Sequence, residues 1–241
     1  MRYIQPSTMH SNHSFKLVAA LVLAGVFICL VGNLRAAEPK AKHTRTHTGT
    51  YQTSNGKSGS FTSTATRGNG EATRSGTATN QDGQTATHNS THTYDKATGT
   101  GTVTSSSTGF NGATTSRTGT FEKNADGSVS SQGTITGPAG KTSTYADTTV
   151  KTANGATTTG TITGPNGRTS NVSSTVTRNG PGDYSRDTNV TSPNGQVATK
   201  DSTTKINADG TGTRVVETTK PDGTTNTRTE TFTVTKTPSG P

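Results

Sequence analysis

The sequence predicts an all-β chain: a repetitive antiparallel β-meander of about 14 short strands, or about seven hairpin repeats of roughly 28 residues, with a thin core. Three observations predict it. The composition lacks helix-forming and core-forming residues, a turn motif recurs about every 14 residues, and the segments between the turns are rich in Thr and in β-branched or aromatic residues.

Composition excludes an ordinary globular core. Hydrophobic residues make up 24% of the chain, and Thr alone makes up roughly a quarter of it. After Ala37 the sequence contains no Leu, Met, Cys or Trp. Such a chain cannot form long amphipathic helices or bury much apolar area, so it must be extended β structure or disordered.

Two alternating series of turns define the repeat. The first series recurs every 27 to 29 residues, at Asn55-Gly56, Asp82-Gly83, Asn111-Gly112, Ala139-Gly140, Asn166-Gly167, Asn194-Gly195 and Asp222-Gly223. The second lies between its members, at Asn69-Gly70, Thr98-Gly99, Asp126-Gly127, Asn154-Gly155, Gly180 to Gly182 and Asp209-Gly210. Motifs such as Gly-Pro-Asn-Gly predict a type I turn closed by a left-handed glycine, as in bulged hairpins. We therefore assign the glycines to turns.

The segments between the turns are predicted to be strands of about 8–10 residues. Residues 229–236 show the expected alternation, with Phe232 and Val234 on one face and threonines on the other. Short turns predict antiparallel neighbours, but they do not determine whether the sheet is open, coiled or closed. A largely disordered low-complexity chain is the alternative, and the regularity of the turns argues against it.

The N-terminus has the layout of a secretory signal peptide. An apolar run, residues 17–34, follows Lys16 and precedes Ala36 and Ala37. We therefore expect a signal peptide over residues 1–37, a basic linker over 38–48, the repeat region over 49–236 and a tail over 237–241. Retention of the apolar run as a membrane anchor is the alternative. The expected location is secreted, either periplasmic or extracellular.

No motif points to catalysis or to a cofactor. The pairs His43/His47 and His88/His92 have i, i+4 spacing, but no cysteine or carboxylate cluster accompanies them, so we interpret them as polar strand surface and expect no metal site. The Asp-Gly turns lack the ligand series of a calcium loop. Ser, His and Asp occur without a catalytic frame such as G-x-S-x-G, so we expect a non-enzyme without cofactors.

The expected function is structural or adhesive, in a secreted or envelope-associated protein that binds multivalently through a polar sheet. The chain carries a net charge of +9, and removal of Arg2, Lys16 and Arg35 with the signal peptide leaves +6. That balance favours an anionic polysaccharide or cell surface as partner, and we expect no specific nucleic acid. The candidate surface-binding residues lie just after turns or on strands, at Lys141, Arg168, Lys200 and Arg214.

Three further functions stay open. Open sheet edges would allow self-association into an extracellular β-fibre. The frequent T-x-T motifs give a surface similar to that of T-x-T ice-binding proteins, although here the motif shifts within the repeat. A cell-wall enzyme would need a carboxylate pair beside aromatic residues, which is not found. Exposed strand positions hold Thr and Ser where a membrane barrel needs apolar side chains, so no membrane contact is expected beyond the N-terminal segment.

Overall fold

The computed structural model describes residues 42–238, and its regular elements are all β-strands. They are β1 (His43–Thr53), β2 (Ser58–Gly68), β3 (Glu71–Asn80), β4 (Thr85–Asp95), β5 (Thr100–Thr108), β6 (Thr114–Lys123), β7 (Val129–Thr136), β8 (Thr142–Thr152), β9 (Gly155–Thr163), β10 (Thr169–Gly180), β11 (Asp183–Thr191), β12 (Val197–Ile206), β13 (Thr211–Thr219) and β14 (Thr225–Pro238). The predicted signal peptide lies outside the described residues. The first strand begins within the segment expected to be a basic linker.

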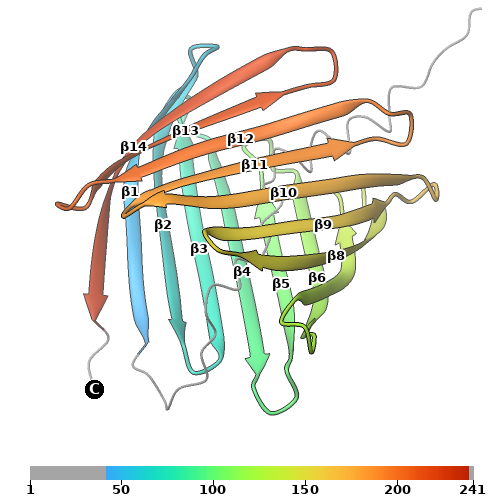
Figure 1. Ribbon diagram of the computed structural model, residues 1–241. Helices are drawn as coiled ribbons and strands as arrows, with labels where there is room; N and C mark the ends of the chain where they lie inside the picture. Colours follow the sequence, from blue (N-terminus) through green and yellow to red (C-terminus); the bar gives the residue numbers. More distant parts are fainter. Residues whose placement is uncertain (1–41, 239–241) are drawn as a thin grey trace, which may run out of the picture.

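The strands form one closed antiparallel barrel in which each strand pairs with its neighbours in sequence (Figure 1). The predicted meander is therefore confirmed, in place of the disordered alternative. Closure, which the sequence left undecided, comes from the pairing of β1 with β14. That pairing joins residues far apart in the chain: the hydroxyls of Thr50 and Thr231 lie 3.1 Å apart and share a hydrogen bond.

Strands of opposite walls cross at a steep angle. In Figure 1, β1 to β6 run roughly vertically and β10 to β13 run roughly horizontally. A closed sheet requires its strands to tilt from the barrel axis by about 35–45°, so opposite walls tilt in opposite senses. Side chains that project inward from the two walls share the interior.

The two turn series of the sequence form the two ends of the barrel. We call the end with Gly56, Gly83, Gly112, Gly140, Gly167, Gly195 and Gly223 the first rim, and the end with Gly70, Gly99, Gly127, Gly182 and Gly210 the second rim; all of these glycines have positive φ. The turn after β7 shows the predicted bulged hairpin. Its Gly140 has φ 70°, and its amide donates to the Gly137 carbonyl at 2.9 Å.

Alternation along the strands separates an inner face from an outer face. The inner face holds the core, which consists of Tyr51, Val103, Phe121, Ile135, Tyr145, Val172, Val190, Ala198, Val216 and Phe232. These side chains are 3% to 9% exposed, and none of the described side chains falls below 2%. The core is thin, as predicted, because each strand contributes about one large apolar residue.

Inner-face aromatic rings lie over glycines of adjacent strands. Gly101 pairs with Phe121, and a Cβ at Gly101 would come 2.2 Å from the Phe121 ring. Tyr94 lies on the other side of this glycine, and its ring stacks on Phe121 with centroids 6.1 Å apart. Such cover protects strand glycines, which otherwise weaken a sheet.

The assignment of all glycines to turns is therefore wrong. Several of them lie inside strands on the inner face, at Gly49, Gly59, Gly76, Gly101, Gly119, Gly133, Gly160 and Gly212. Those covered by an aromatic ring provide the space that the ring fills.

Candidate functional site

Charge is separated between the two faces of the barrel wall. The inner face of the strands carries twelve basic side chains: Arg45, Arg67, Arg74, Arg117, Lys123, Lys151, Arg178, Arg186, Lys200, Arg214, Arg228 and Lys236. It carries two acidic ones, Asp147 and Glu230. The interior of the barrel is therefore strongly positive, and it favours anions.

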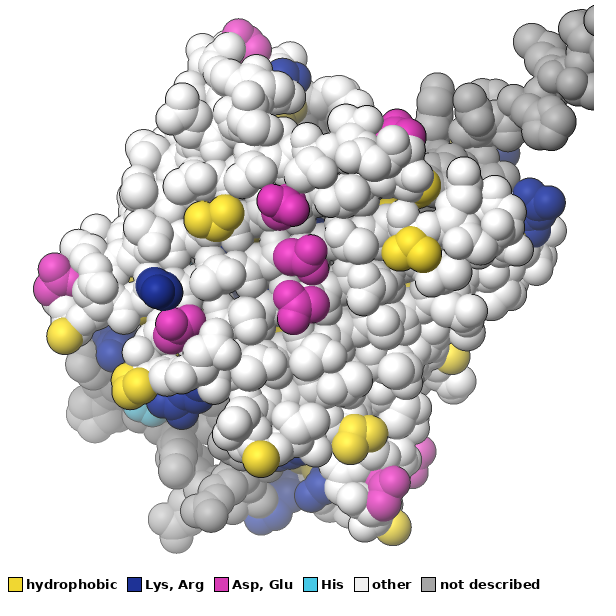
Figure 2. Space-filling view, turned by 45° about the horizontal axis from the view of Figure 1, so that its top comes forward, with side chains coloured by type: hydrophobic (Ala, Val, Ile, Leu, Met, Phe, Trp, Pro, Cys, Tyr) yellow, Lys and Arg dark blue, Asp and Glu magenta, His cyan; other side chains and the backbone are white. Residues whose placement is uncertain are grey.

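The outer face of the strands has the opposite balance. Its acidic side chains are Glu71, Asp95, Glu122, Asp183, Asp187, Asp201 and Glu217, and its one basic side chain is Lys205. Figure 2 shows one outer face as mostly uncharged surface crossed by a short row of acidic side chains. The register places Asp187, Asp201 and Glu217 side by side across three strands. The Asp201 carboxyl has a raised pKa because burial and its two acidic neighbours disfavour its charge.

Six of the inward cations lie near the second rim and are exposed. They are Arg45, Arg67, Lys123, Lys151, Arg178 and Lys236. Each lies near the end of its strand at this rim, and Arg45 is the register partner of Lys236 across the β1–β14 seam. We call these six residues the cationic collar. They place solvent-accessible positive charge around the inner side of the second rim, whose outer side carries Glu71, Asp95, Glu122 and Asp183.

Deeper in the barrel, half-buried cations surround one carboxylate. Glu230 of β14 is 5% exposed; it accepts a hydrogen bond from Arg228 Nε at 2.8 Å and lies 4.0 Å from Arg214 Nη1. Burial and the charges of Arg214, Arg228 and Arg186 lower the pKa of Lys200 to about 8. Burial likewise lowers the pKa of Arg214 from its ordinary value, and Glu230 partly opposes that shift. The inner positive charge is thus only partly neutralised by the nearest described acid.

The other inward carboxylate, Asp147, belongs to β8. Its Oδ2 lies 3.7 Å from Arg117 Nη2, and burial raises the pKa of Asp147 in spite of that arginine. The Arg117 guanidinium also lies over the Tyr145 ring, 3.9 Å from its centroid. Arg117, Asp147 and Tyr145 thus connect β6 to β8 inside the barrel, and we assign them a structural role.

The prediction that the histidines form polar strand surface is wrong for three of them, which do not lie on the outer face. His47, His88 and His92 face inward, and burial, followed by nearby arginines, lowers the pKa of each below its ordinary value. His47 stacks on Phe232 with ring centroids 5.4 Å apart, and His88 Nδ1 lies 2.7 Å from Ser107 Oγ. Among residues 42–238 no group of three or more metal-binding side chains is placed to hold an ion.

The structure divides the four candidate surface residues into two pairs. Lys141 and Arg168 lie exposed in turns of the first rim. Lys200 and Arg214 instead face the barrel interior, on β12 and β13. The four therefore do not form one surface. The collar was missed because strand parity was not applied to the charges: Phe121 and Lys123 are two residues apart and thus share a face.

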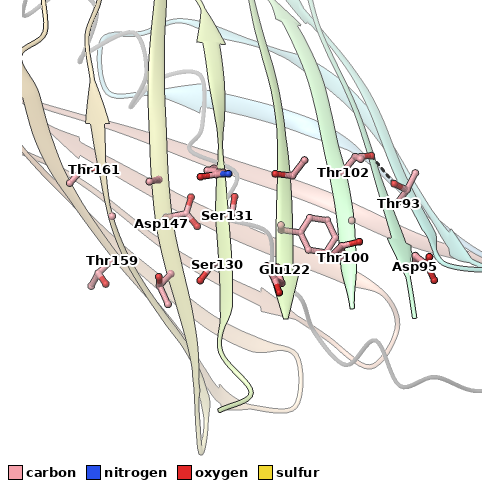
Figure 3. A pocket seen from close by; sticks show the side chains of 17 residues that line it. Thr93, Asp95, Thr100, Thr102, Glu122, Ser130, Ser131, Asp147, Thr159 and Thr161 are labelled. Atoms are coloured by element: carbon pink, nitrogen blue, oxygen red, sulfur yellow. Dashed lines mark hydrogen bonds between the residues drawn. The ribbon is translucent and has the colours of Figure 1, made fainter. Parts of the chain in front are cut away.

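A second feature, a polar groove of about 750 Å³, crosses the outer face over β4 to β9 (Figure 3). Its lining is mainly hydroxyl side chains, with the acidic residues Asp95, Glu122 and Asp147 and no Lys or Arg. The hydroxyls of Thr93 and Thr102 lie 2.7 Å apart and share a hydrogen bond, drawn as a dashed line in Figure 3.

Neither the comparisons with known proteins nor the hydropathy of the described residues assigns the chain to a known class of protein. No family model matches the sequence, and no match was found among curated proteins or solved structures. In the part of the chain that the structure describes, no helix has the length and apolar character needed to span a membrane. The function must therefore be argued from the barrel itself.

Proposed function

We propose that the protein is a non-catalytic, secreted or envelope-associated binding barrel that attaches to an anionic polysaccharide through its cationic collar. The observation that carries this proposal is the separation of charge across the wall, positive inside and negative outside. The proposal keeps the ligand class expected from the sequence, an anionic polysaccharide, and moves the binding site to the cationic collar. A polyanion is attracted to the cationic inner side of the second rim and repelled by the outer carboxylates, four of which lie on the outer side of that rim.

The collar suits a polymer better than a small ion. Its six side chains are exposed and come from β1, β2, β6, β8, β10 and β14, so they are distributed around the rim. Each exposed ion pair contributes only about 0.5 kcal/mol, but a chain with repeated charges engages several at once. Binding of this kind is multivalent and sensitive to salt.

The other functions expected from the sequence find less support. Fibre growth through open edges needs an unpaired strand, and all 14 strands have partners on both sides. A cell-wall enzyme needs an acid–base pair in a cleft. The inner carboxylates Asp147 and Glu230 lie beside arginines, and the outer row Asp187, Asp201 and Glu217 lies outside the groove. The signal-like N-terminus supports the proposed location.

Binding to immobilised dextran sulfate, with uncharged dextran as reference, tests the proposal. We expect the full chain to bind dextran sulfate and to be released by salt. The double variant Lys123→Gln/Lys151→Gln should bind about fivefold more weakly, from about 0.5 kcal/mol per lost ion pair.

The matched control is Lys205→Gln. Lys205 lies near the same rim but on the outer face, where its amino group is 4.0 Å from Asp183. Its loss should leave the affinity unchanged. Equal weakening by both variants, or equal retention of the chain on uncharged dextran, would overturn the proposal. A thermal melt of each variant verifies that the barrel is intact.

A further inference from the structure

The outer groove runs across the strands between two parallel rows of side chains. Register pairing joins Thr93, Thr102, Thr120, Gln132, Ala146 and Thr161 into one row, which we call the hydroxyl row. It joins Asp95, Thr100, Glu122, Ser130, Thr148 and Thr159 into the other, which we call the carboxylate row. Each row crosses six strands, and Figure 3 shows labelled members of both.

The dimensions of the groove follow from sheet geometry. Neighbouring strands lie about 4.8 Å apart, so six strands give a trough of about 24 Å. Residues two apart along a strand are separated by about 7 Å, which sets the spacing of the rows. The floor is the backbone of residues whose side chains face inward, among them Gly101, Phe121 and Gly160. A volume of about 750 Å³ is typical of a small-ligand site.

The chemistry of the groove is that of a polyol site. Side-chain hydroxyls both donate and accept hydrogen bonds, and the Gln132 amide does the same. Carboxylate oxygens accept from hydroxyl groups, and one oxygen of Asp95 is already used by the Ala97 amide at 2.8 Å. Because the lining has three acidic residues, Asp95, Glu122 and Asp147, and no cation, it disfavours the anionic ligand of the collar.

We propose that this groove is a second, separate binding site that takes an extended, uncharged oligosaccharide lying across the strands. An extended glycan presents hydroxyls at regular intervals along its length, and the two rows present a polar side chain at every position except Ala146. Each sugar unit makes a few hydrogen bonds to Thr and Ser, and affinity accumulates along the trough. The site does not depend on the proposed function of the collar, since the two lie on opposite faces of the wall.

Calorimetric titration with cellohexaose tests the inference. The intact chain should bind it weakly, and dextran sulfate should not compete. The double variant Thr102→Val/Thr120→Val removes two groove hydroxyls while keeping side-chain volume, and it should weaken cellohexaose binding at least fivefold.

The control is Thr104→Val/Thr118→Val. These two threonines are register partners on the same strands and the same face, one position beyond the groove. They should leave cellohexaose affinity unchanged. Absence of cellohexaose binding, or the same loss in both double variants, would overturn the groove site. Lys123→Gln/Lys151→Gln should retain cellohexaose binding, so failure of the collar proposal is distinguishable from failure of this one.

Discussion

The inner and outer faces of this barrel are built from the same strands but differ in the residue types that they carry. The inner face holds the aromatic and aliphatic residues, the glycines beneath them and most of the basic side chains. The outer face holds threonines, serines and most of the strand acids. Two adjacent residues of a strand therefore differ in solvent exposure, in neighbouring side chains and in the electrostatic field around them.

Hydroxyl pairs replace a hydrophobic layer on the outer face. Cross-strand hydrogen bonds join Thr44 to Thr66 at 3.0 Å and Thr118 to Thr134 at 3.0 Å. Each pair contributes little, because exposed hydrogen bonds exchange with water. The inner face should therefore carry most of the stability, and substitutions at matched positions on the two faces can test this.

The largest contrast is expected between Phe121 and Thr118, which lie on the same strand. Phe121 is 7% exposed, so Phe121→Ala leaves a cavity and should lower the free energy of unfolding by about 4 kcal/mol. Thr118→Ala on the outer face should lower it by about 0.5 kcal/mol. Urea denaturation measures both. Similar losses for the two variants would show that the inner face does not dominate stability.

Two inner-face glycines provide a finer comparison. A Cβ at Gly101 would approach the Phe121 ring and the Thr93 carbonyl to 2.2 Å, whereas a Cβ at Gly76 would meet its nearest neighbour at 3.6 Å. Gly101→Ala should therefore cost about 3 kcal/mol through overpacking. Gly76→Ala should be neutral or slightly stabilising, because it removes chain entropy from the unfolded state. If both variants unfold at the wild-type urea midpoint, the aromatic–glycine contact is not a steric constraint.

The pH dependence of stability sharpens the electrostatic contrast. The pKa of Lys200 is lowered from 10.5 to about 8 by burial and nearby arginines, so between these values the unfolded chain binds more protons than the folded one. Stability should therefore rise between pH 8 and pH 10.5, by about 2 kcal/mol after allowance for residual solvent contact.

Lys200→Met should remove that rise, and Lys205→Met, on the outer face of the same strand, should preserve it. Unfolding in urea at a series of pH values measures the slope. A slope unchanged in Lys200→Met would place the titration on another group.

Strand number and turn chemistry could be predicted because both are local properties. Gly-Pro-Asn-Gly fixes its own turn, and eight to ten residues between turns leave room for only one strand. The alternation along the strands could also have placed the basic residues on the inner face. Thr44 and Thr46 flank Arg45, and Thr227 and Thr229 flank Arg228, so each arginine lies on the face opposite to its neighbouring threonines. The groove could not have been found this way, since its rows cross six strands and depend on register.

The sequence by itself determined the all-β class, the meander and the alternation of residues along each strand, because turns and pleats act over a few residues. Only the tertiary structure decided that the sheet closes. The pairing of β1 with β14 closes it and encloses the side that carries the apolar residues. Because the sheet is closed, side chains that lie on the same face of different strands share one interior. That single long-range pairing therefore brings the inward arginines and lysines together.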